Sequence, residues 1–223
     1  MNTSFYVSLD KDALYHNIEY LREYKQKELL PVIKANAYGH NSLLIAKALY
    51  DFDIKTWAVA RFSEAITIIE YMMDNFSIND FKILVFESLD DDYSFLEKYP
   101  EICPTINSIK DLKNALANNI SIDRLSLKID FGFGRNGIKA EEVDELKNLI
   151  KFNSLKFLGI FSHLFSATYT DGLEVIKKFT EVVNKLGRDN FEMVHLQNAA
   201  GIYNYDVEVV THIRTGMLTY GLQ

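Results

Sequence analysis

The sequence predicts an α/β fold built from repeated parallel βα units. Short apolar runs alternate with amphipathic segments of roughly 10–15 residues along the chain, which is the pattern of strands joined by crossover helices. Eight apolar runs follow one another from Pro31 onward, ending near Lys34, Ala60, Phe86, Ile106, Asp130, His163, Gln197 and Leu222. Eight such units suggest a TIM-type (β/α)8 barrel. Periodicity alone leaves a doubly wound open sheet as the alternative.

Capping residues mark several of the expected helix starts. Asp10 is expected to cap a helix that reaches about Tyr24 and places Leu14, Ile18 and Leu21 on one face. Further helices are expected over 41–50, 64–73 with Ser63 as cap, 110–117 with Ser108 as cap, 140–151 and 172–186, and an acidic helix start at 89–92. The expected strands are 5–9, 29–34, 56–60, 81–86, 102–106, 125–130, 157–163, 193–197 and 212–222.

Composition excludes several classes of function. The 223 residues are 48% apolar, which suits a globular domain with a real core. A net charge of −7 argues against a nucleic-acid binder, and no apolar run is long enough to span a membrane. Residues 1–4 show no secretory signal, and the single cysteine, Cys103, fits a reducing compartment. We therefore expect a cytoplasmic protein. The five histidines lie too far apart in the sequence to form a local metal motif, so no metal is expected.

One lysine stands at the end of an apolar strand. Lys34 is flanked by Val32, Ile33 and Ala35, where desolvation favours the neutral amine. A neutral amine can form a Schiff base with a carbonyl, and pyridoxal 5'-phosphate (PLP) is the commonest cofactor to use one. The alternative is a strand-end lysine whose charged tip reaches water.

A glycine-rich loop follows the fifth expected strand. Gly132, Gly134 and Gly137 match the G-x-G-x-x-G fingerprint of dinucleotide-binding folds. The loop does not open the fold, however, and Arg135 and Asn136 put bulk inside it. An NAD-binding open sheet that uses this loop is one of the hypotheses that the residues leave open.

The stretch around Lys34 also carries a family resemblance. Residues 32–40 resemble the PLP-lysine signature of the alanine racemase family, and the resemblance recurs along nearly the whole chain. It implies a (β/α)8 barrel of a fold type III PLP enzyme, with residues 1–223 as a single PLP-binding domain. The family's C-terminal β-domain would follow Gln223, so we expect a chain that lacks this domain and the last barrel helix.

The resemblance assigns roles to residues at several strand ends. Lys34 would be the catalytic residue that holds PLP as an internal aldimine. Arg135 would contact the cofactor's phenolic oxygen and the substrate carboxylate, oriented by Lys128, which is usually carbamylated in the family. His163 would lie against the pyridine ring, and His195 would support Arg214.

Arg214 would face the pyridine nitrogen. An arginine keeps its proton, so it donates a hydrogen bond and leaves that nitrogen unprotonated, which favours reprotonation at Cα over transamination. The remaining cofactor contacts implied by the resemblance are Tyr38, Asn198, Gly216 and Met217. Ala199 stands where the family often has a phosphate-binding serine, and the stretch after it is closer to the serine/alanine racemase branch.

The function implied is interconversion of L- and D-alanine, which supplies a peptidoglycan precursor. In the family a tyrosine from the partner subunit's C-terminal domain serves as the second base, so a homodimer is expected. Without that second base, this barrel by itself is expected to racemise poorly. The alternatives are a non-catalytic PLP-binding homeostasis barrel and a serine racemase.

Overall fold

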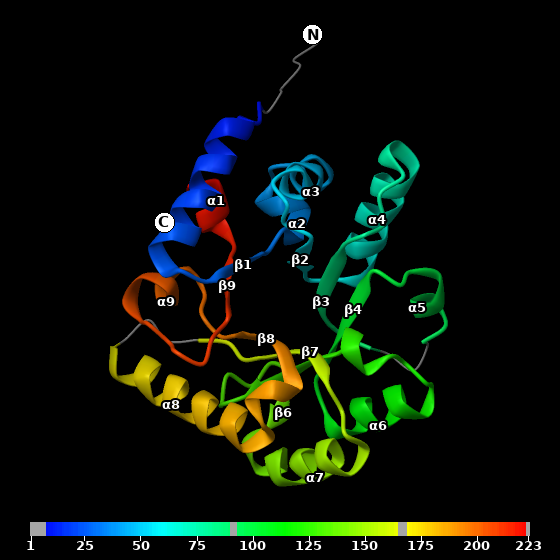
Figure 1. Ribbon diagram of the computed structural model, residues 1–223, viewed down its shortest axis with the longest axis vertical. Coiled ribbons are helices and arrows are strands. Elements are labelled where there is room, and N and C mark those ends of the chain that lie inside the picture. The colour runs from blue at the N-terminus through cyan, green and yellow to red at the C-terminus, as the bar shows by residue number, and fades with distance from the viewer. Residues whose placement is uncertain (1–7, 90–92, 165–168, 222–223) are drawn as a thin grey trace.

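The computed structural model describes residues 8–89, 93–164 and 169–221 (Figure 1). The strands are β1 Glu28–Pro31, β2 Thr56–Val59, β3 Lys82–Ser88, β4 Ile102–Ile106, β5 Ser126–Asp130, β6 Ile138–Lys139, β7 Phe157–Phe161, β8 Phe191–His195 and β9 His212–Thr215. The α-helices are α1 Lys11–Lys25, α2 Lys34–Tyr38, α3 Ser42–Asp51, α4 Phe62–Phe76, α5 Phe95–Lys98, α6 Ile109–Ala117, α7 Val143–Asn153, α8 Tyr169–Leu186 and α9 Ala199–Asn204. Short 3₁₀ turns are η1 Ile122–Arg124, η2 Ala140–Glu142, η3 Arg188–Asn190 and η4 Met217–Tyr220.

The parallel strands close into a barrel. β2, β3, β4, β5, β7 and β8 pair in this order, and β1 pairs with β9. A bridge between Val32 and Ala58 joins β1 to β2, and the N–H of Thr211 donates to the carbonyl of Val194 at 2.9 Å to join β9 to β8. Among the described strands, the short β6 lies off this ring, and the other eight complete it. The expected (β/α)8 barrel is confirmed, and the open sheet is wrong.

Helix α1 covers the seam between the first and last barrel strands. Asp10 caps it as expected, accepting hydrogen bonds from the amides of Asp12 and Ala13. The expected apolar face, Leu14, Ile18 and Leu21, is buried. Asn17 donates to the carbonyl of Thr219 at 3.3 Å, which ties α1 to η4. Up to residue 221, β9 is followed only by η4, and α1 contacts both η4 and β1 (Figure 1).

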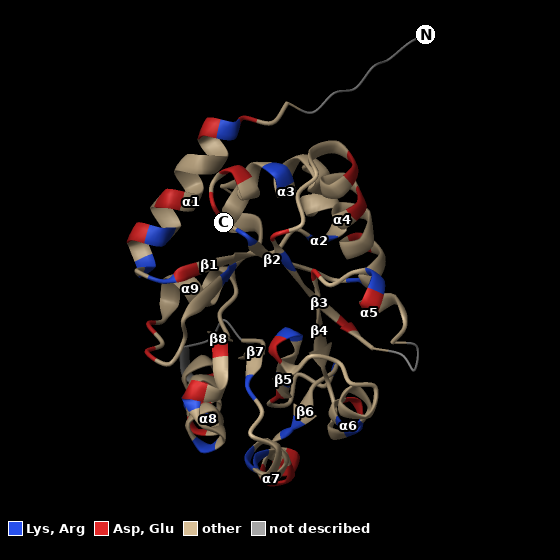
Figure 2. Cartoon of the chain, turned by 45° about the vertical axis from the view of Figure 1, so that its right-hand side comes forward, with Lys and Arg blue, Asp and Glu red and all other residues tan. Residues whose placement is uncertain are grey.

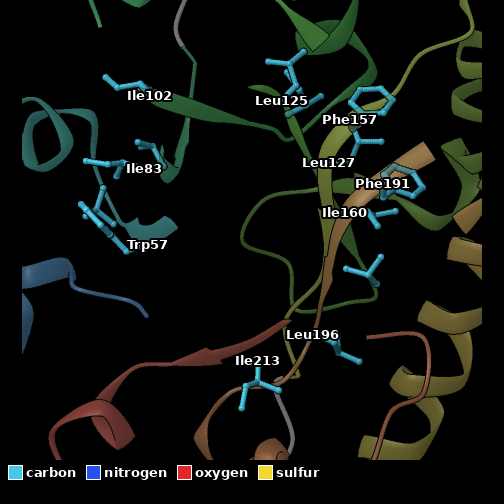
Figure 3. Packing of buried hydrophobic residues seen from close by; sticks show 14 of the residues in the cluster. Trp57, Ile83, Ile102, Leu125, Leu127, Phe157, Ile160, Phe191, Leu196 and Ile213 are labelled. Atoms are coloured by element: carbon cyan, nitrogen blue, oxygen red, sulfur yellow. The ribbon is translucent and has the colours of Figure 1, made fainter. Parts of the chain in front are cut away.

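Alternation along each strand separates two packed regions. Leu127 and Ile129 of β5 belong to the large apolar cluster between the strands and the outer helices, part of which Figure 3 shows. Ser126 and Lys128 occupy the alternate positions, which face the barrel interior. A separate small cluster of Leu30, Val32, Ala58 and Leu84 lies on that inner side. Polar side chains near the ends of the strands are therefore directed toward the barrel axis.

Charged residues lie mainly on the outer helices. In Figure 2, bands of acidic and basic residues follow α1, α7 and α8, while the strands are mostly neutral. The described helices contain none long and apolar enough to cross a membrane. Charged side chains on the inner side of the barrel are therefore exceptions to this distribution.

Two expected strands end earlier than the sequence suggested. β1 ends at Pro31, and Lys34 begins a helical turn instead of ending a strand. β9 ends at Thr215, because Gly216 turns the chain (φ −79°, ψ −107°) into η4. The hydroxyl of Thr219 donates to the carbonyl of Thr215 at 2.7 Å and holds that turn closed.

Other expected elements differ from the structure or fall partly on residues that the structure does not describe. Helix α4 starts at Phe62 rather than behind Ser63, because the carboxylates of Glu64 and Glu87 accept the amides of Arg61 and Phe62. Helix α9 and strand β6 were not foreseen. Residues 8 and 9 are not in a strand, and the rest of the strand expected over 5–9 lies outside the described residues, as do residues 90–92 of the acidic helix start.

The turn α2 is left-handed after its first residue. Ala35, Asn36, Ala37 and Tyr38 have φ between +51° and +55°. For L-residues this conformation costs roughly 1–2 kcal/mol each, and only glycine adopts it freely. The turn is closed by the amide of Ala37 donating to the carbonyl of Ile33 at 2.9 Å. A strained segment therefore directly follows Lys34.

Replacing Ala35 with glycine should stabilise the fold. Relief of the left-handed strain outweighs the larger backbone entropy of glycine in the unfolded chain, so Ala35→Gly is expected to raise the free energy of unfolding by about 0.5–1 kcal/mol. Urea denaturation measures the change. Ala13→Gly, at an exposed position in the right-handed α1, is the matched control and should lower that free energy. A loss of stability in Ala35→Gly would contradict the strain.

Candidate functional site

A cavity of about 620 Å³ opens at the carboxyl ends of the barrel strands. This volume lies within the range of small-molecule sites, and this rim is where barrels of this kind carry their active sites. Nine of the ten residues singled out from the sequence line it: Lys34, Tyr38, Lys128, Arg135, His163, Asn198, Arg214, Gly216 and Met217. The tenth, His195, lies behind Arg214. The structure thus brings together residues that the sequence spreads over five strand ends, those of β1, β5, β7, β8 and β9.

The cavity wall is strongly cationic. Five basic side chains line it, whereas Glu87 is the one acidic residue of the lining. The basic residues are Lys34, Arg61, Lys128, Arg135 and Arg214. Because the whole chain carries a net charge of −7, this local excess of positive charge is opposite in sign to the average. The cavity is therefore suited to an anionic ligand.

Arg214 is buried at the base of the cavity and is held mainly by backbone carbonyls. Its NH2 group donates to the carbonyls of Ser162 and Leu196, both at 2.9 Å, and NH1 donates to Nδ1 of His195 at 2.8 Å. No carboxylate of the described residues pairs with it. Burial and, second, the nearby Arg135 lower the pKa of Arg214 to about 10, so the guanidinium stays charged at neutral pH. Its Nε–H has no acceptor among the described residues.

His195 fixes the orientation of Arg214. A guanidinium can only donate, so Nδ1 of His195 accepts and the ring proton resides on Nε2. The ring stacks on Phe161 with centroids 4.8 Å apart. Burial, followed by the positive charge of Arg214, holds the pKa of His195 well below its usual range. This histidine is therefore neutral and supports the arginine without adding charge.

Lys128 points from β5 into the same cavity. It is 5% exposed, and its Nζ donates to Oδ1 of Asn136. Burial, followed by repulsion from Arg135, lowers the pKa of Lys128 to about 8. A substantial share of this amine is neutral under mildly alkaline conditions, so it can act as a nucleophile.

His163 and Arg135 meet around one aromatic ring. The His163 ring lies 5.1 Å from the ring of Phe133, and the Arg135 guanidinium lies 4.9 Å from the Phe133 centroid. Burial, followed by the positive charge of Arg214, lowers the pKa of His163 to about 4. A neutral imidazole at this position can pack flat against an aromatic ligand.

Tyr38 and Gly216 are in direct contact. A Cβ built on Gly216 would lie 2.7 Å from the hydroxyl oxygen of Tyr38. Any side chain at position 216 would therefore displace the tyrosine. Burial raises the pKa of Tyr38, although Arg214 opposes the shift, so its hydroxyl remains a hydrogen-bond donor.

Asn198 joins two of the loops at the rim. Its Nδ2 donates to the carbonyl of Leu164 at 2.8 Å, and its Oδ1 caps α9 by accepting the amide of Gly201 at 3.0 Å. Both ends of the side chain are therefore engaged. Asn198 shapes the cavity wall, with Ala199 and Ala200 next to it in the lining.

The glycine-rich loop does not form a dinucleotide site. The carboxylate of Asp130 accepts the amides of Phe133 and Gly134 at 3.0 Å, so these donors are already taken. The loop leads into β6 and a 3₁₀ turn rather than a long helix, which a pyrophosphate site requires. The NAD-binding interpretation is wrong.

Some lining residues were missed by sequence reasoning. Phe86 and Phe161 contribute aromatic surface, Glu87 lies near the end of β3, and Asn136 accepts a hydrogen bond from Lys128. The position of each at or just after a strand end was the available signal. Within the described ranges, no group of three His, Cys, Asp or Glu side chains could hold a metal ion.

The sequence matches a known family model and is similar to curated proteins. The family model described as "Alanine racemase, N-terminal domain" matches residues 9–223. Alanine racemase from Fusobacterium nucleatum is 33% identical over 96% of this chain and 60% of its own length, and that from Staphylococcus saprophyticus is 29% identical over 98% of this chain and 57% of its own. The chain therefore spans less than two thirds of the length of these relatives.

Solved structures give the same result for the fold. Alanine racemase from E. faecalis superimposes with a TM-score of 0.81 at 27% identity, covering 96% of this chain and 59% of that one. The alanine racemase from Bartonella henselae, which has covalently bound pyridoxal phosphate, gives 0.80 at 23% identity over 96% of this chain and 62% of that one.

The buried histidines should make the fold sensitive to acid. His163, with a pKa of about 4, and His195 and His212, whose pKa values burial also lowers, stay neutral in the folded state. The unfolded chain binds their protons below about pH 6.5. The free energy of unfolding should therefore fall as the pH falls from about 6.5 to 4. In His163→Gln, urea denaturation should show that the free energy of unfolding falls less steeply with pH. The reason is that unfolding of this variant takes up as much as about one proton fewer. An unchanged slope would contradict this assignment.

Proposed function

This chain belongs to the alanine racemase family, and on that premise we propose that residues 1–223 form the PLP-binding barrel domain of an amino-acid racemase that interconverts L- and D-alanine. The observation that supports the proposal most directly is the cationic cavity at the barrel rim, which gathers Lys34, Arg135 and Arg214. Serine is the second substrate to test, because the stretch after Ala199 is closer to the serine/alanine racemase branch of the family.

The residues present fit PLP. The cofactor combines an aromatic ring with a phosphate dianion and an aldehyde, so its site needs a flat contact, anion donors and an amine. The cavity offers the neutral His163 ring, a cationic wall and Lys34. The unpaired Nε–H of Arg214 and the close approach of Tyr38 to Gly216 are features that a bound ligand would explain.

When bound, PLP supplies an electron sink that makes the Cα proton of an attached amino acid removable. Lys34 would first hold the cofactor covalently. Once an amino acid replaces it, the freed Lys34 amine would remove or return the proton on one face of Cα. Its half-buried side chain at the cavity wall supports both roles.

Arg214 would restrain the chemistry at the ring nitrogen. Carbonyl oxygens and His195 hold the guanidinium, so it can present an N–H to an acceptor in the cavity but does not release a proton near neutral pH. A hydrogen bond without proton transfer leaves a pyridine nitrogen neutral. That weakens electron withdrawal and favours reprotonation at Cα, which is the outcome that racemisation needs.

Arg135 and Lys128 would bind the substrate side of the site. The planar fork of Arg135 suits a carboxylate, and Phe133 supports its guanidinium from below. The lowered pKa of Lys128 supports the carbamylation that the family resemblance implies, because a neutral amine adds to carbon dioxide and releases a proton. The resulting negative charge would attract Arg135 and hold it over the cavity.

The phosphate end would lie between Tyr38 and the start of η4. The amides of Gly216 and Met217 stand where the first N–H groups of a helical turn lack intrahelical acceptors. The Tyr38 hydroxyl adjoins them. Asn198 would act through the loops that it joins, and Ala199 offers no hydroxyl there.

Racemisation requires a second proton-transfer group on the opposite face of Cα. We propose that a partner subunit supplies it in a homodimer, as the family resemblance implies. Exposed apolar side chains at the rim, Phe133 and Met217, support a protein contact there. The proposed role is cytoplasmic supply of D-alanine for peptidoglycan.

Borohydride reduction tests the cofactor assignment. After incubation with PLP, reduction and digestion, mass spectrometry should find one PLP adduct on the peptide that contains Lys34. The adduct should be absent in Lys34→Ala, with circular dichroism confirming that this variant folds. A folded wild-type chain that forms no adduct on Lys34 would contradict the proposed site.

Substitution of Gly216 tests the phosphate end. Gly216→Ala would push against the Tyr38 hydroxyl, so we expect PLP to bind about tenfold more weakly, corresponding to a loss of about 1.4 kcal/mol. Equilibrium titration of PLP absorbance measures the change. Gly134→Ala is the control for an added methyl group without a clash, because its Cβ meets nothing within 4 Å; its positive φ of 74° strains alanine, a cost that should lower the stability of the fold and leave PLP affinity unchanged. Equal affinities in Gly216→Ala and wild type would refute the placement.

A further inference from the structure

We propose that Glu64 is a positioning residue for Lys34, whose carboxylate anchors the peptide that follows the lysine and thereby aims its amine into the cavity. This inference rests on the proposed function. Glu64 lies in the first turn of α4, outside the cavity lining, and sequence reasoning noted it only as the start of a helix.

Both oxygens of the Glu64 carboxylate are used. Oε1 accepts the amide of Ala35 at 2.6 Å, across a separation of 29 residues. Oε2 accepts the amides of Ala60 and Arg61 at 2.9 and 3.0 Å. One charged side chain thus connects the segments that leave two neighbouring barrel strands, and charge-assisted hydrogen bonds of this kind are the stronger ones.

The Ala35 amide is the position where such an anchor is most needed. It belongs to the peptide that joins Lys34 to the left-handed turn, and Ala35 has φ +51°. The internal hydrogen bonds of the turn begin only at the amide of Ala37, which donates to Ile33. Without Glu64, the Lys34–Ala35 peptide could rotate and relax the strain, which would redirect the Lys34 side chain.

A purely structural role for Glu64 accounts for only part of these contacts. A glutamate at the third position of a helix commonly accepts the amide of the N-cap residue, which here is Arg61. That role does not require the bond to Ala35, which lies outside α4. Asp111 provides the comparison, because it occupies the third position of α6 and accepts the amide of Asn107 at 3.1 Å without contacting the cavity.

The experiment compares Glu64→Ala, Glu64→Gln and Asp111→Ala in the full chain. Two quantities are measured: hydrogen exchange of the Ala35 amide without cofactor, and the rate at which PLP forms the borohydride-trapped adduct on Lys34. In Glu64→Ala we expect exchange to accelerate and adduct formation to slow, each by about tenfold or more. Glu64→Gln retains one carbonyl acceptor and should recover part of both. Asp111→Ala should lower thermal stability but leave both quantities unchanged.

The outcomes separate this inference from the proposed function. If the wild-type chain forms no adduct on Lys34, the proposed function fails and this inference fails with it. If the wild type forms the adduct but Glu64→Ala forms it at the same rate, only the positioning role is overturned. Equal losses in Glu64→Ala and Asp111→Ala would likewise show that Glu64 acts as an ordinary helix cap.

Discussion

The site depends on a buried cation that is held without a carboxylate partner. Arg214 donates to the carbonyls of Ser162 and Leu196 and to the ring of His195, so it joins the ends of β7, β8 and β9. Charge buried in this way is costly unless its donors are satisfied. The loops that carry those acceptors are therefore fixed in position, and the positive charge remains available to a ligand in the cavity.

The same charge controls the protonation of its neighbours. Arg214 is among the causes that lower the pKa values of His163, Lys128 and His195, although burial is the largest cause for each. As a result, the charged Arg214 lies beside two neutral histidines and a lysine that is readily neutralised. Such a set can bind an anion and orient an aromatic ring, while Lys34 remains the group best placed for proton transfer.

Backbone strain is the second feature of the site. Four consecutive left-handed residues follow Lys34, and the turn persists because its ends are tied to other parts of the barrel. Such strain often marks functional segments, where surrounding structure overrides the local preference. Here it allows a single turn to place Lys34 and Tyr38 on the same cavity wall.

The sequence by itself determined the alternation of the eight barrel strands with their main helices, the caps Asp10 and Ser108, and the family, because local periodicity and a long specific signature around Lys34 carry that information. It also identified nine of the residues that line the cavity, since polar side chains at strand ends share one rim of a parallel barrel.

Only the tertiary structure decided how these parts meet. Ring closure through Val32 and Thr211, the use of Asp130 to occupy the glycine-rich loop, and the reach of Glu64 to Ala35 all depend on contacts between distant segments. The left-handed turn was also beyond sequence reasoning, because alanine and tyrosine disfavour it locally. Long-range hydrogen bonds override that preference, and they exist only once the barrel is formed.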